Sequence, residues 1–341
     1  MKNLITLMFV FLLVIGCYKS NGQNNSELII KRELTFVSDG TQLVGTLYLP
    51  KGKDLPVIVI THGSGKGGRH MRGYQYQGEF FPKLGFATFI FDKRGVGASE
   101  GEYVESTDFN IPARDLIAAV KIVKSQPEIA KNKIGVMGIS QGGWIGPLAA
   151  TLSKDISFVI SFVGGGVSVR DQVLHHRKSE LIQKGWSKIK IDSAVTFCKR
   201  LYDYCATGEG YYVLNKDYIE ASSKAWFSFI KDQGFGSKLP RPESLNHPWF
   251  QSLKYDPKET EGKLDIPFLA VFGELDTHVP TNDAVKAMKA AFEKSGFKNF
   301  KIVIAPNEGH NTFKVEDGII GFRELFKEPL VKWLNTLIKE L

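Results

Sequence analysis

The chain has 341 residues with 43% hydrophobic and 23% charged residues, and its formal net charge is +8. The length would accommodate two domains, but strand and helix patterns interleave along the whole chain, which favours one α/β domain carrying an insertion. Basic residues are spread without a dense Lys/Arg cluster, so the charge gives no support to nucleic-acid binding.

The first residues have the pattern of an export signal. Lys2 precedes an almost wholly apolar stretch, residues 4–15, and Cys17 follows it. A stretch of about a dozen apolar residues is too short to span a bilayer as a mature helix. The pattern is typical of a bacterial lipoprotein, with residues 1–16 as the signal peptide, a lipidated Cys17 and a flexible tether over residues 17–27. We expect a membrane-anchored protein of the cell envelope, on its periplasmic or surface side; an ordinary secretory signal is the alternative.

The predicted strands and helices alternate from residue 28 to residue 341. Residues 28–37 and 42–49, joined by an Asp-Gly turn, predict an antiparallel hairpin at the edge of a sheet. Six apolar runs of buried-strand type follow, at residues 57–61, 87–91, 133–137, 158–162, 268–272 and 300–305. Apolar positions at three- and four-residue spacing predict helices at residues 111–125, 141–152, 281–295 and 322–339. The order predicts a mostly parallel, doubly wound, eight-stranded sheet.

One long segment, about residues 165–262, has a different character. It is rich in clustered aromatic residues and contains no strong strand pattern. We interpret it as a helical cap over the carboxyl ends of the strands, where ligands bind in such sheets. The cap is then expected to shape the substrate pocket, although most of its aromatic residues are expected to form its own small core.

The motif Gly138-Ile139-Ser140-Gln141-Gly142 follows a predicted strand and opens a predicted helix. A serine on such a tight turn has a strained backbone, and side chains two positions away on either side would collide with the strand and the helix. Ser64 and Ser99 lack this frame. The pattern therefore predicts Ser140 as a nucleophile.

A carboxylate and a histidine each follow a later strand. Asp276 comes after the run at 268–272, and His310 comes after the run at 300–305. An imidazole must take the serine proton, and a buried carboxylate must orient that imidazole. Glu274 lies on the same loop as Asp276 and is the alternative acid.

The turn His62-Gly63-Ser64-Gly65 follows another strand and offers backbone donors. We expect the N–H groups of Ser64 and Gln141 to form an oxyanion hole, with His62 orienting the loop.

The order Ser140, Asp276, His310 resembles that of the α/β-hydrolase superfamily, over roughly residues 28–341. The motifs Asp92-Lys93-Arg94-Gly95-Val96-Gly97-Ala98-Ser99 and Ser140-Gln141-Gly142-Gly143-Trp144 are similar to bacterial esterases often described as serine aminopeptidase-like or acyl-thioester hydrolase-like. The resemblance implies a serine carboxylesterase that cleaves small to medium acyl esters through an acyl-enzyme intermediate. An amidase or thioesterase with the same triad, and a binding or scaffold lipoprotein without activity, are the alternatives.

No metal or cofactor motif is present, and the adjacent His175 and His176 are interpreted as an ordinary surface or cap feature. We expect a small-molecule ester, and the membrane through Cys17, as the partners. Cys198 and Cys205 are seven residues apart on a predicted helix, which places them too far apart for a disulfide if that helix is straight.

Overall fold

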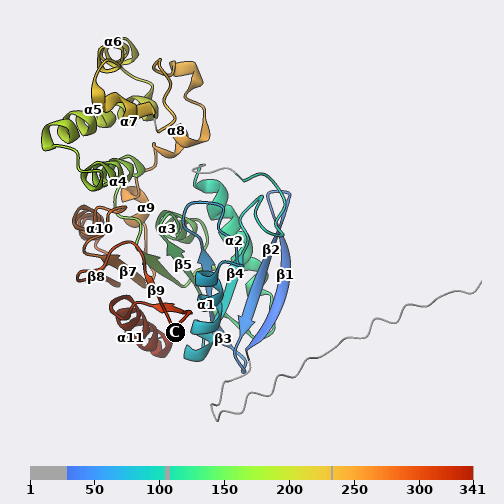
Figure 1. Cartoon of the computed structure of the whole chain (residues 1–341). Helices are drawn as coiled ribbons and strands as arrows, with labels where there is room; N and C mark the ends of the chain where they lie inside the picture. The colour runs from blue at the N-terminus through green and yellow to red at the C-terminus, as the bar shows by residue number, and fades with distance from the viewer. Residues whose placement is uncertain (1–28, 104–107, 232, 341) are drawn as a thin grey trace, which may run out of the picture.

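The computed structural model describes residues 29–103, 108–231 and 233–340. The predicted signal peptide, Cys17 and the tether lie outside these residues. The central element is an eight-stranded sheet of order β1-β2-β4-β3-β5-β6-β7-β8 (Figure 1). Its strands are β1 (Ile30–Ser38), β2 (Thr41–Leu49), β3 (Leu55–Thr61), β4 (Ala87–Phe91), β5 (Ile129–Ile139), β6 (Phe158–Phe162), β7 (Phe268–Gly273) and β8 (Phe300–Ala305). The predicted α/β-hydrolase sheet is thereby confirmed.

The sheet is parallel except at one side. The β1–β2 hairpin is antiparallel, and β2 pairs antiparallel with β4, whereas all pairs from β4 to β8 are parallel. All residues of β3, β4, β6 and β7 are buried, because helices cover both faces of the central strands. The edge strand β1 instead exposes every second residue from Lys31 to Val37.

Helices cover the sheet in two layers. One face packs against α2 (Asn110–Lys124), α3 (Gly142–Leu152) and α10 (Thr281–Ser295), and the other against α1 (Arg72–Phe80) and α11 (Glu324–Glu340). The short helix η1 (Phe81–Leu84) continues α1, and a hairpin of β9 (Phe313–Glu316) and β10 (Ile319–Phe322) precedes α11. The sequence patterns missed α1 and this hairpin, because both are short and only partly apolar.

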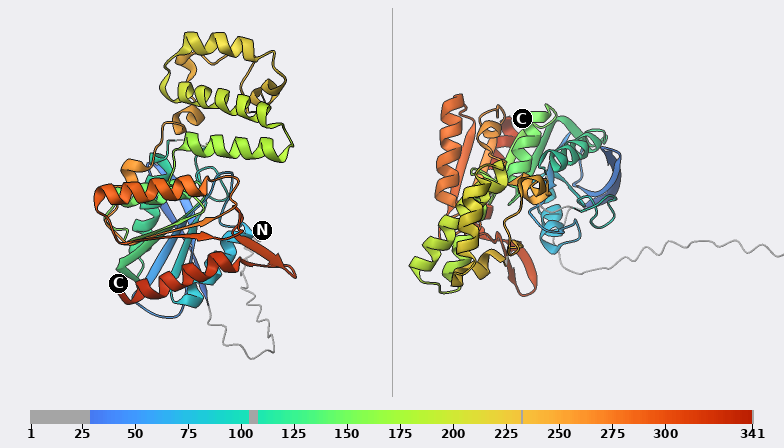
Figure 2. Two further views of the ribbon diagram at one scale, coloured as in Figure 1. Left: turned by 90° about the vertical axis from the view of Figure 1, so that its left-hand side faces the viewer. Right: turned by 90° about the horizontal axis from the view of Figure 1, so that it is seen from above.

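Between β6 and β7 the described chain is helical. It forms α4 (Val169–Gln183), α5 (Lys188–Thr207), α6 (Tyr211–Ala221), η2 (Ala225–Phe227), α7 (Ser228–Lys231), η3 (Pro242–Ser244), α8 (Pro248–Ser252) and α9 (Lys258–Glu261). Figure 2 shows most of these helices stacked above the body that contains the sheet. We call residues 165–262 the insertion.

The insertion has a core of its own, in which Phe197, Leu201, Tyr218 and Phe227 are buried. The aromatic residues therefore pack mainly against one another, as expected for most of them. Cys198 and Cys205 are free, buried thiols on the single helix α5.

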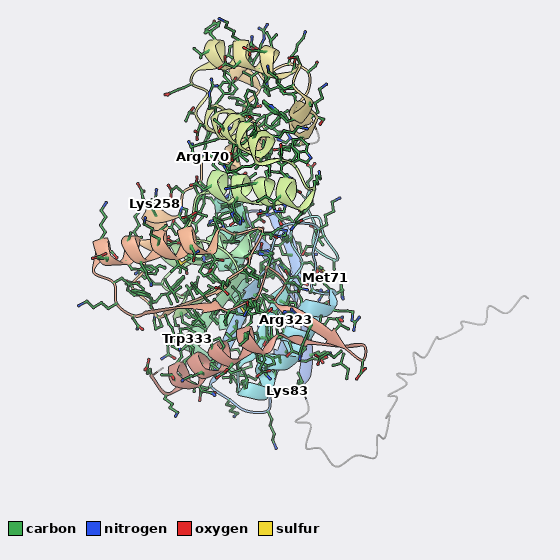
Figure 3. All side chains as sticks on the ribbon, turned by 60° about the vertical axis from the view of Figure 1, so that its left-hand side comes forward. Met71, Lys83, Arg170, Lys258, Arg323 and Trp333 are labelled. Carbon is green, nitrogen blue, oxygen red and sulfur yellow. The ribbon has the colours of Figure 1, made fainter. Side chains whose placement is uncertain are left out.

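The insertion is tied to the body where it leaves and re-enters the sheet. The indole N–H of Trp144 on α3 donates to the carbonyl of Val167 at 2.9 Å, which joins the body to the insertion. The N–H of Gly166 donates to the Glu261 carboxyl group at 2.9 Å, which joins the two ends of the insertion to each other. Figure 3 labels Arg170 on α4 and Lys258 on α9 at this junction. Within the described residues, no helix combines the length and the apolar character needed to cross a membrane.

Candidate active site

Ser140 lies on a sharp turn between β5 and α3. Its φ of +52° is in the left-handed region, which is strained for a residue with a side chain. The N–H of Ser140 donates to the carbonyl of Phe162 at 2.9 Å, which fixes the turn against β6. A Cβ at Gly138 would lie 1.9 Å from the carbonyl oxygen of Gly142, and one at Gly142 would lie 2.8 Å from that of Thr61. Both flanking glycines are therefore required by space, as the sequence motif predicts.

The structure brings Ser140, His310 and Asp276 together, each from a loop that follows a different parallel strand. His310 Nε2 lies 3.0 Å from Ser140 Oγ, and His310 Nδ1 lies 2.8 Å from Asp276 Oδ2. The His310 side chain is 22% exposed, whereas that of Asp276 is fully buried. This is the hydrogen-bond chain that a histidine base with an orienting carboxylate requires.

The Asp276 carboxylate is held by its own loop. Its second oxygen, Oδ1, accepts hydrogen bonds from the N–H groups of His278 at 2.7 Å and Val279 at 2.9 Å. The alternative acid, Glu274, is exposed and accepts a hydrogen bond from the N–H of Asn307 at 2.8 Å. Of the two carboxylates on this loop, Asp276 is the one that contacts His310.

The turn at residues 62–65 packs directly beside the nucleophile. A Cβ on Gly63 would lie 3.3 Å from the Cβ of Ser140. The ammonium group of Lys93 donates to the carbonyls of Gly63 at 2.5 Å and Gly65 at 3.0 Å, while the N–H of Gly63 donates to the hydroxyl of Tyr74 at 3.2 Å. Lys93 and Tyr74 thus fix the backbone of this turn, a role that the sequence alone did not indicate.

The predicted oxyanion donors are the N–H groups of Ser64 and Gln141. Neither N–H donates to another group within the described part of the chain. Gln141 immediately precedes the first residue of α3, where backbone N–H groups have no partner inside the helix and the helix dipole favours negative charge. The two positions are therefore suited to an oxyanion.

His62 is buried, with 1% of its surface exposed. Neither ring nitrogen has a hydrogen-bond partner among the described residues, and the ring makes edge contacts with Tyr74 and Phe91. Burial and then the charge of Lys93 lower the pKa of His62 to about 3. A neutral, enclosed imidazole packs the base of the turn and has no access to the serine proton.

A column of histidines joins the insertion to the triad. The His278 ring stacks on that of His310 at 4.5 Å and on that of His176 at 4.2 Å. Nε2 of His175 lies 3.0 Å from the backbone oxygen of Asp276. Burial, followed by the charges of His310 and His176, lowers the pKa of His278 to about 4.

His175 and His176, interpreted from the sequence as a surface or cap feature, both lie on α4 of the insertion. Both residues of α4 contact the loop that carries the acid. Nothing in the local sequence could have revealed this, because the contact spans about a hundred residues and depends on how the insertion sits.

Asp276, His278 and His310 offer ligand atoms within 4.8 Å of one another, a grouping that could hold a metal ion. However, both oxygens of Asp276 already accept hydrogen bonds, one of them within the Ser140–His310–Asp276 chain. The donor set is thus arranged for the triad.

The charged loop after β4 is held by ion pairs. Asp92 is completely buried and accepts hydrogen bonds from the backbone and guanidinium of Arg69 at 2.8 and 3.0 Å. Arg94 pairs with Asp115 on α2 at 2.7 Å. These contacts fix the loop that presents Lys93 to the turn at 62–65.

Comparison with known proteins finds similarity to hydrolases. Residues 52–207 match the family model described as serine aminopeptidase, S33. The chain is 32% identical over 130 residues to a thiohydrolase, AneE, of Aspergillus aculeatus, and 33% identical over 114 residues to the monoglyceride lipase of Rattus norvegicus. These matches cover 38% and 33% of the chain, and 40% and 36% of the respective relatives.

Solved structures show the same fold over most of the chain. An esterase of Pyrococcus furiosus superposes with a TM-score of 0.58 at 16% identity, covering 95% of this chain and 96% of that one. Est1E of Butyrivibrio proteoclasticus, solved with ferulic acid, superposes with a TM-score of 0.53 at 21% identity, covering 90% and 98%. The chain is thus an α/β hydrolase by fold, and its similarity to the serine aminopeptidase S33 family lies in the half that carries Ser140.

Proposed function

We propose that this protein is a serine carboxylesterase that hydrolyses acyl esters through an acyl-enzyme intermediate. The observation that carries the proposal is the continuous chain from Ser140 Oγ to His310 and Asp276, at 3.0 and 2.8 Å. The turn at residues 62–65 lies against the same serine. It carries the N–H group of Ser64, one of the two expected oxyanion donors; the other is the N–H group of Gln141.

Each group has one task in this mechanism. Ser140 Oγ attacks the ester carbonyl carbon while His310 takes the hydroxyl proton, and Asp276 stabilises the imidazolium that forms. The N–H groups of Ser64 and Gln141 hold the oxyanion. The tetrahedral intermediate collapses when the C–O bond to the alcohol breaks and His310 returns the proton to the leaving oxygen. Water, deprotonated by His310, then attacks the acyl group and releases the acid.

The charges of the insertion argue against an aminopeptidase. Such an enzyme would need free carboxylates to bind the amino terminus of a peptide. Several acidic residues on its helices α4, α5 and α6 are already in ion pairs: Glu180 with Arg177, Asp192 with Lys188, Asp203 with Lys199, and Asp217 with Arg200. An ester is therefore the better substrate class.

A thioester is the second candidate, favoured by the similarity to a protein named a thiohydrolase. The same triad would cleave it, with a thiolate as the leaving group. A binding or scaffold protein is the non-enzymatic alternative, and the hydrogen-bonded triad argues against it because binding alone does not need one.

We also propose that the protein is a membrane-anchored lipoprotein of the cell envelope. The support is the sequence pattern that ends at Cys17, which lies outside the described residues. Labelled palmitate should be incorporated into the expressed chain and not into a Cys17→Ala variant. Equal labelling of the two would rule out this anchor.

The proposed activity can be tested with the purified full chain in mild detergent. It should hydrolyse p-nitrophenyl esters faster than aminoacyl p-nitroanilides, and the matched acyl-coenzyme A thioesters would measure the second candidate. Ser140→Ala should lower ester turnover by about 10⁴-fold or more without changing the thermal unfolding midpoint. Faster anilide cleavage would move the assignment to a peptidase, and inactivity on all three would favour a binding protein.

A further inference from the structure

A cavity of about 220 Å³ lies beside the nucleophile turn. Gln141 and His62 line it next to Ser140, and its apolar wall is formed by Phe91, Phe109, Ile111, Pro112 and Ile145. These residues come from the loops after β3 and β4 and from the first turns of α2 and α3. Among the described residues, none of those that line the cavity belongs to the insertion.

Three of the four charged residues that line this cavity make contacts within the protein. Arg94 is bound to Asp115 at 2.7 Å, and the Lys93 ammonium group donates to two carbonyls of the turn at 62–65. The fourth, Glu102, is exposed and would repel a carboxylate, and the rest of the wall is largely apolar, so the interior is suited to an uncharged, apolar group. A carboxylate placed there would lose its hydration without gaining a dedicated partner.

The position fits one part of an ester. A carbonyl oxygen held by the N–H groups of Ser64 and Gln141 would place the carbonyl carbon at Ser140 Oγ. His62 belongs to the same turn as Ser64, and Gln141 is itself a donor, so the cavity that they line is adjacent to the carbonyl carbon. We propose that the cavity binds the acyl group, and that the substrates are esters of short, uncharged acids; this inference rests on the proposed esterase function.

The size of the cavity sets an upper limit on the chain. At about 30 Å³ per water-sized group, 220 Å³ holds no more than about seven such groups, and less once packing is imperfect. The best acyl chains should therefore have about four to six carbons. The cavity is also smaller than most pockets for drug-sized ligands, which start at about 300 Å³.

Two wall residues should set this limit. Ile145 lies in the first turn of α3, five residues after Ser140, and is 2% exposed. Ile111 lies opposite it in the first turn of α2 and is half-buried. Shortening Ile145 lengthens the cavity, whereas a larger side chain at 111 fills it.

The experiment measures kcat/KM of the full chain for p-nitrophenyl esters from acetate to laurate. The kcat/KM of the wild type should be highest with the butyrate or hexanoate ester and at least about 10-fold lower with the laurate ester. Each methylene group that does not fit the cavity lowers kcat/KM substantially. Ile145→Ala should move the optimum to longer chains. Ile111→Trp should lower kcat/KM for hexanoate by about 10-fold or more and leave acetate within about threefold.

The matched control is Leu174→Ala on α4, which removes an aliphatic side chain from the groove between the insertion and α10. It should leave the chain-length profile unchanged. A wild-type optimum at decanoate or longer would overturn the proposal. So would a chain-length profile that changes in Leu174→Ala but stays the same in both Ile145→Ala and Ile111→Trp. Thermal unfolding checks that each variant folds. If Ile145→Ala does not fold, the chain-length profiles of Ile111→Trp and of the wild type decide whether the proposal holds.

The charge of the acyl group is tested at equal length. The pentanoyl ester should be preferred to the glutaryl monoester by about 10-fold or more, and the reverse order would contradict an uncharged substrate class. If the wild type shows no Ser140-dependent turnover of any ester, the proposed function itself fails and this inference falls with it. If esters are turned over in a Ser140-dependent way but the chain-length profile does not change in the cavity variants, only the assignment of the cavity is overturned.

Discussion

The body and the insertion are built in different ways. In the body, Ser140 is held by a strained turn between fully buried strands, with glycines on either side that leave no room for a Cβ. In the insertion, helices pack around aromatic residues that contact one another, and their outer charges pair with one another. The reacting groups are thus fixed by the sheet, and the insertion reaches them mainly through His175 and His176. Under the proposed function, the chemistry belongs to the body, whereas the insertion supports it from one side.

The largest effect should come from the acid in the body. Asp276→Asn keeps the shape of the side chain but leaves His310 without the carboxylate that fixes its tautomer, so kcat should fall by about 10³- to 10⁴-fold. The matched control is Glu274→Gln on the same loop, which should change kcat by less than about threefold. A larger loss in Glu274→Gln than in Asp276→Asn would show that the acid is misassigned.

The next effect concerns the junction between the two regions. Glu261 is completely buried, and burial raises its pKa to about 8. The folded state therefore keeps this group protonated, while the unfolded chain releases the proton above its usual pKa of 4.5. The contribution of Glu261 to the free energy of unfolding that comes from its raised pKa is fully present below pH 4.5. This contribution is lost as the pH rises through about 8.

Glu261→Gln removes this titration. Relative to the wild type, the variant should gain stability between pH 5 and pH 8, by roughly 3 kcal/mol in total. Urea unfolding at several pH values measures the difference. A difference that stays constant with pH would mean that Glu261 is ionised in the folded protein throughout this range.

A smaller effect is expected from the turn at residues 62–65. Lys93→Met removes two hydrogen bonds to its carbonyls, so the donor at Ser64 should lose its position and kcat should fall by about 10- to 100-fold with KM little changed. Lys93→Arg should recover part of this loss. The control is Lys66→Met, which removes a different lysine, one that directly follows this turn in the sequence and lies over the Tyr103 ring. A rise in KM alone would instead place Lys93 in substrate binding.

The smallest effect should come from the insertion. His176→Ala removes the ring that stacks on His278, so the column behind His310 loses one contact. We expect kcat/KM to fall by about two- to fivefold and the free energy of unfolding to fall by about 1 kcal/mol. His176→Phe should retain the stacking and most of the activity. A loss as large as that in Asp276→Asn would make the insertion part of the catalytic machinery and would contradict the assignment of the chemistry to the body.

Much of the body could be predicted from the sequence because its signals are local. Buried strands such as residues 87–91 are continuous apolar runs, and the glycines around Ser140 are a direct consequence of the tight turn. The order of Ser140, Asp276 and His310 along the chain also carried information about the sheet. These features need no knowledge of distant contacts.

Other parts of the site depend on contacts between distant segments. The bonds from Lys93 to the turn join residues about 30 positions apart, and the histidine column joins α4 to a loop about 100 positions later. Neither leaves a periodic pattern. The expectation that the insertion shapes the substrate pocket stays a prediction, whereas the described residues that line the cavity beside Gln141 come from the body.

The most direct test of this account is to identify the residue that becomes acylated. The full chain is incubated with p-nitrophenyl butyrate at low pH to slow deacylation, or with a serine-directed fluorophosphonate, and its peptides are analysed by mass spectrometry. The account predicts a single adduct on Ser140, absent from Ser140→Ala and strongly reduced in His310→Ala. An adduct on Ser64 or Ser99, or no adduct on a folded and otherwise intact protein, would contradict it.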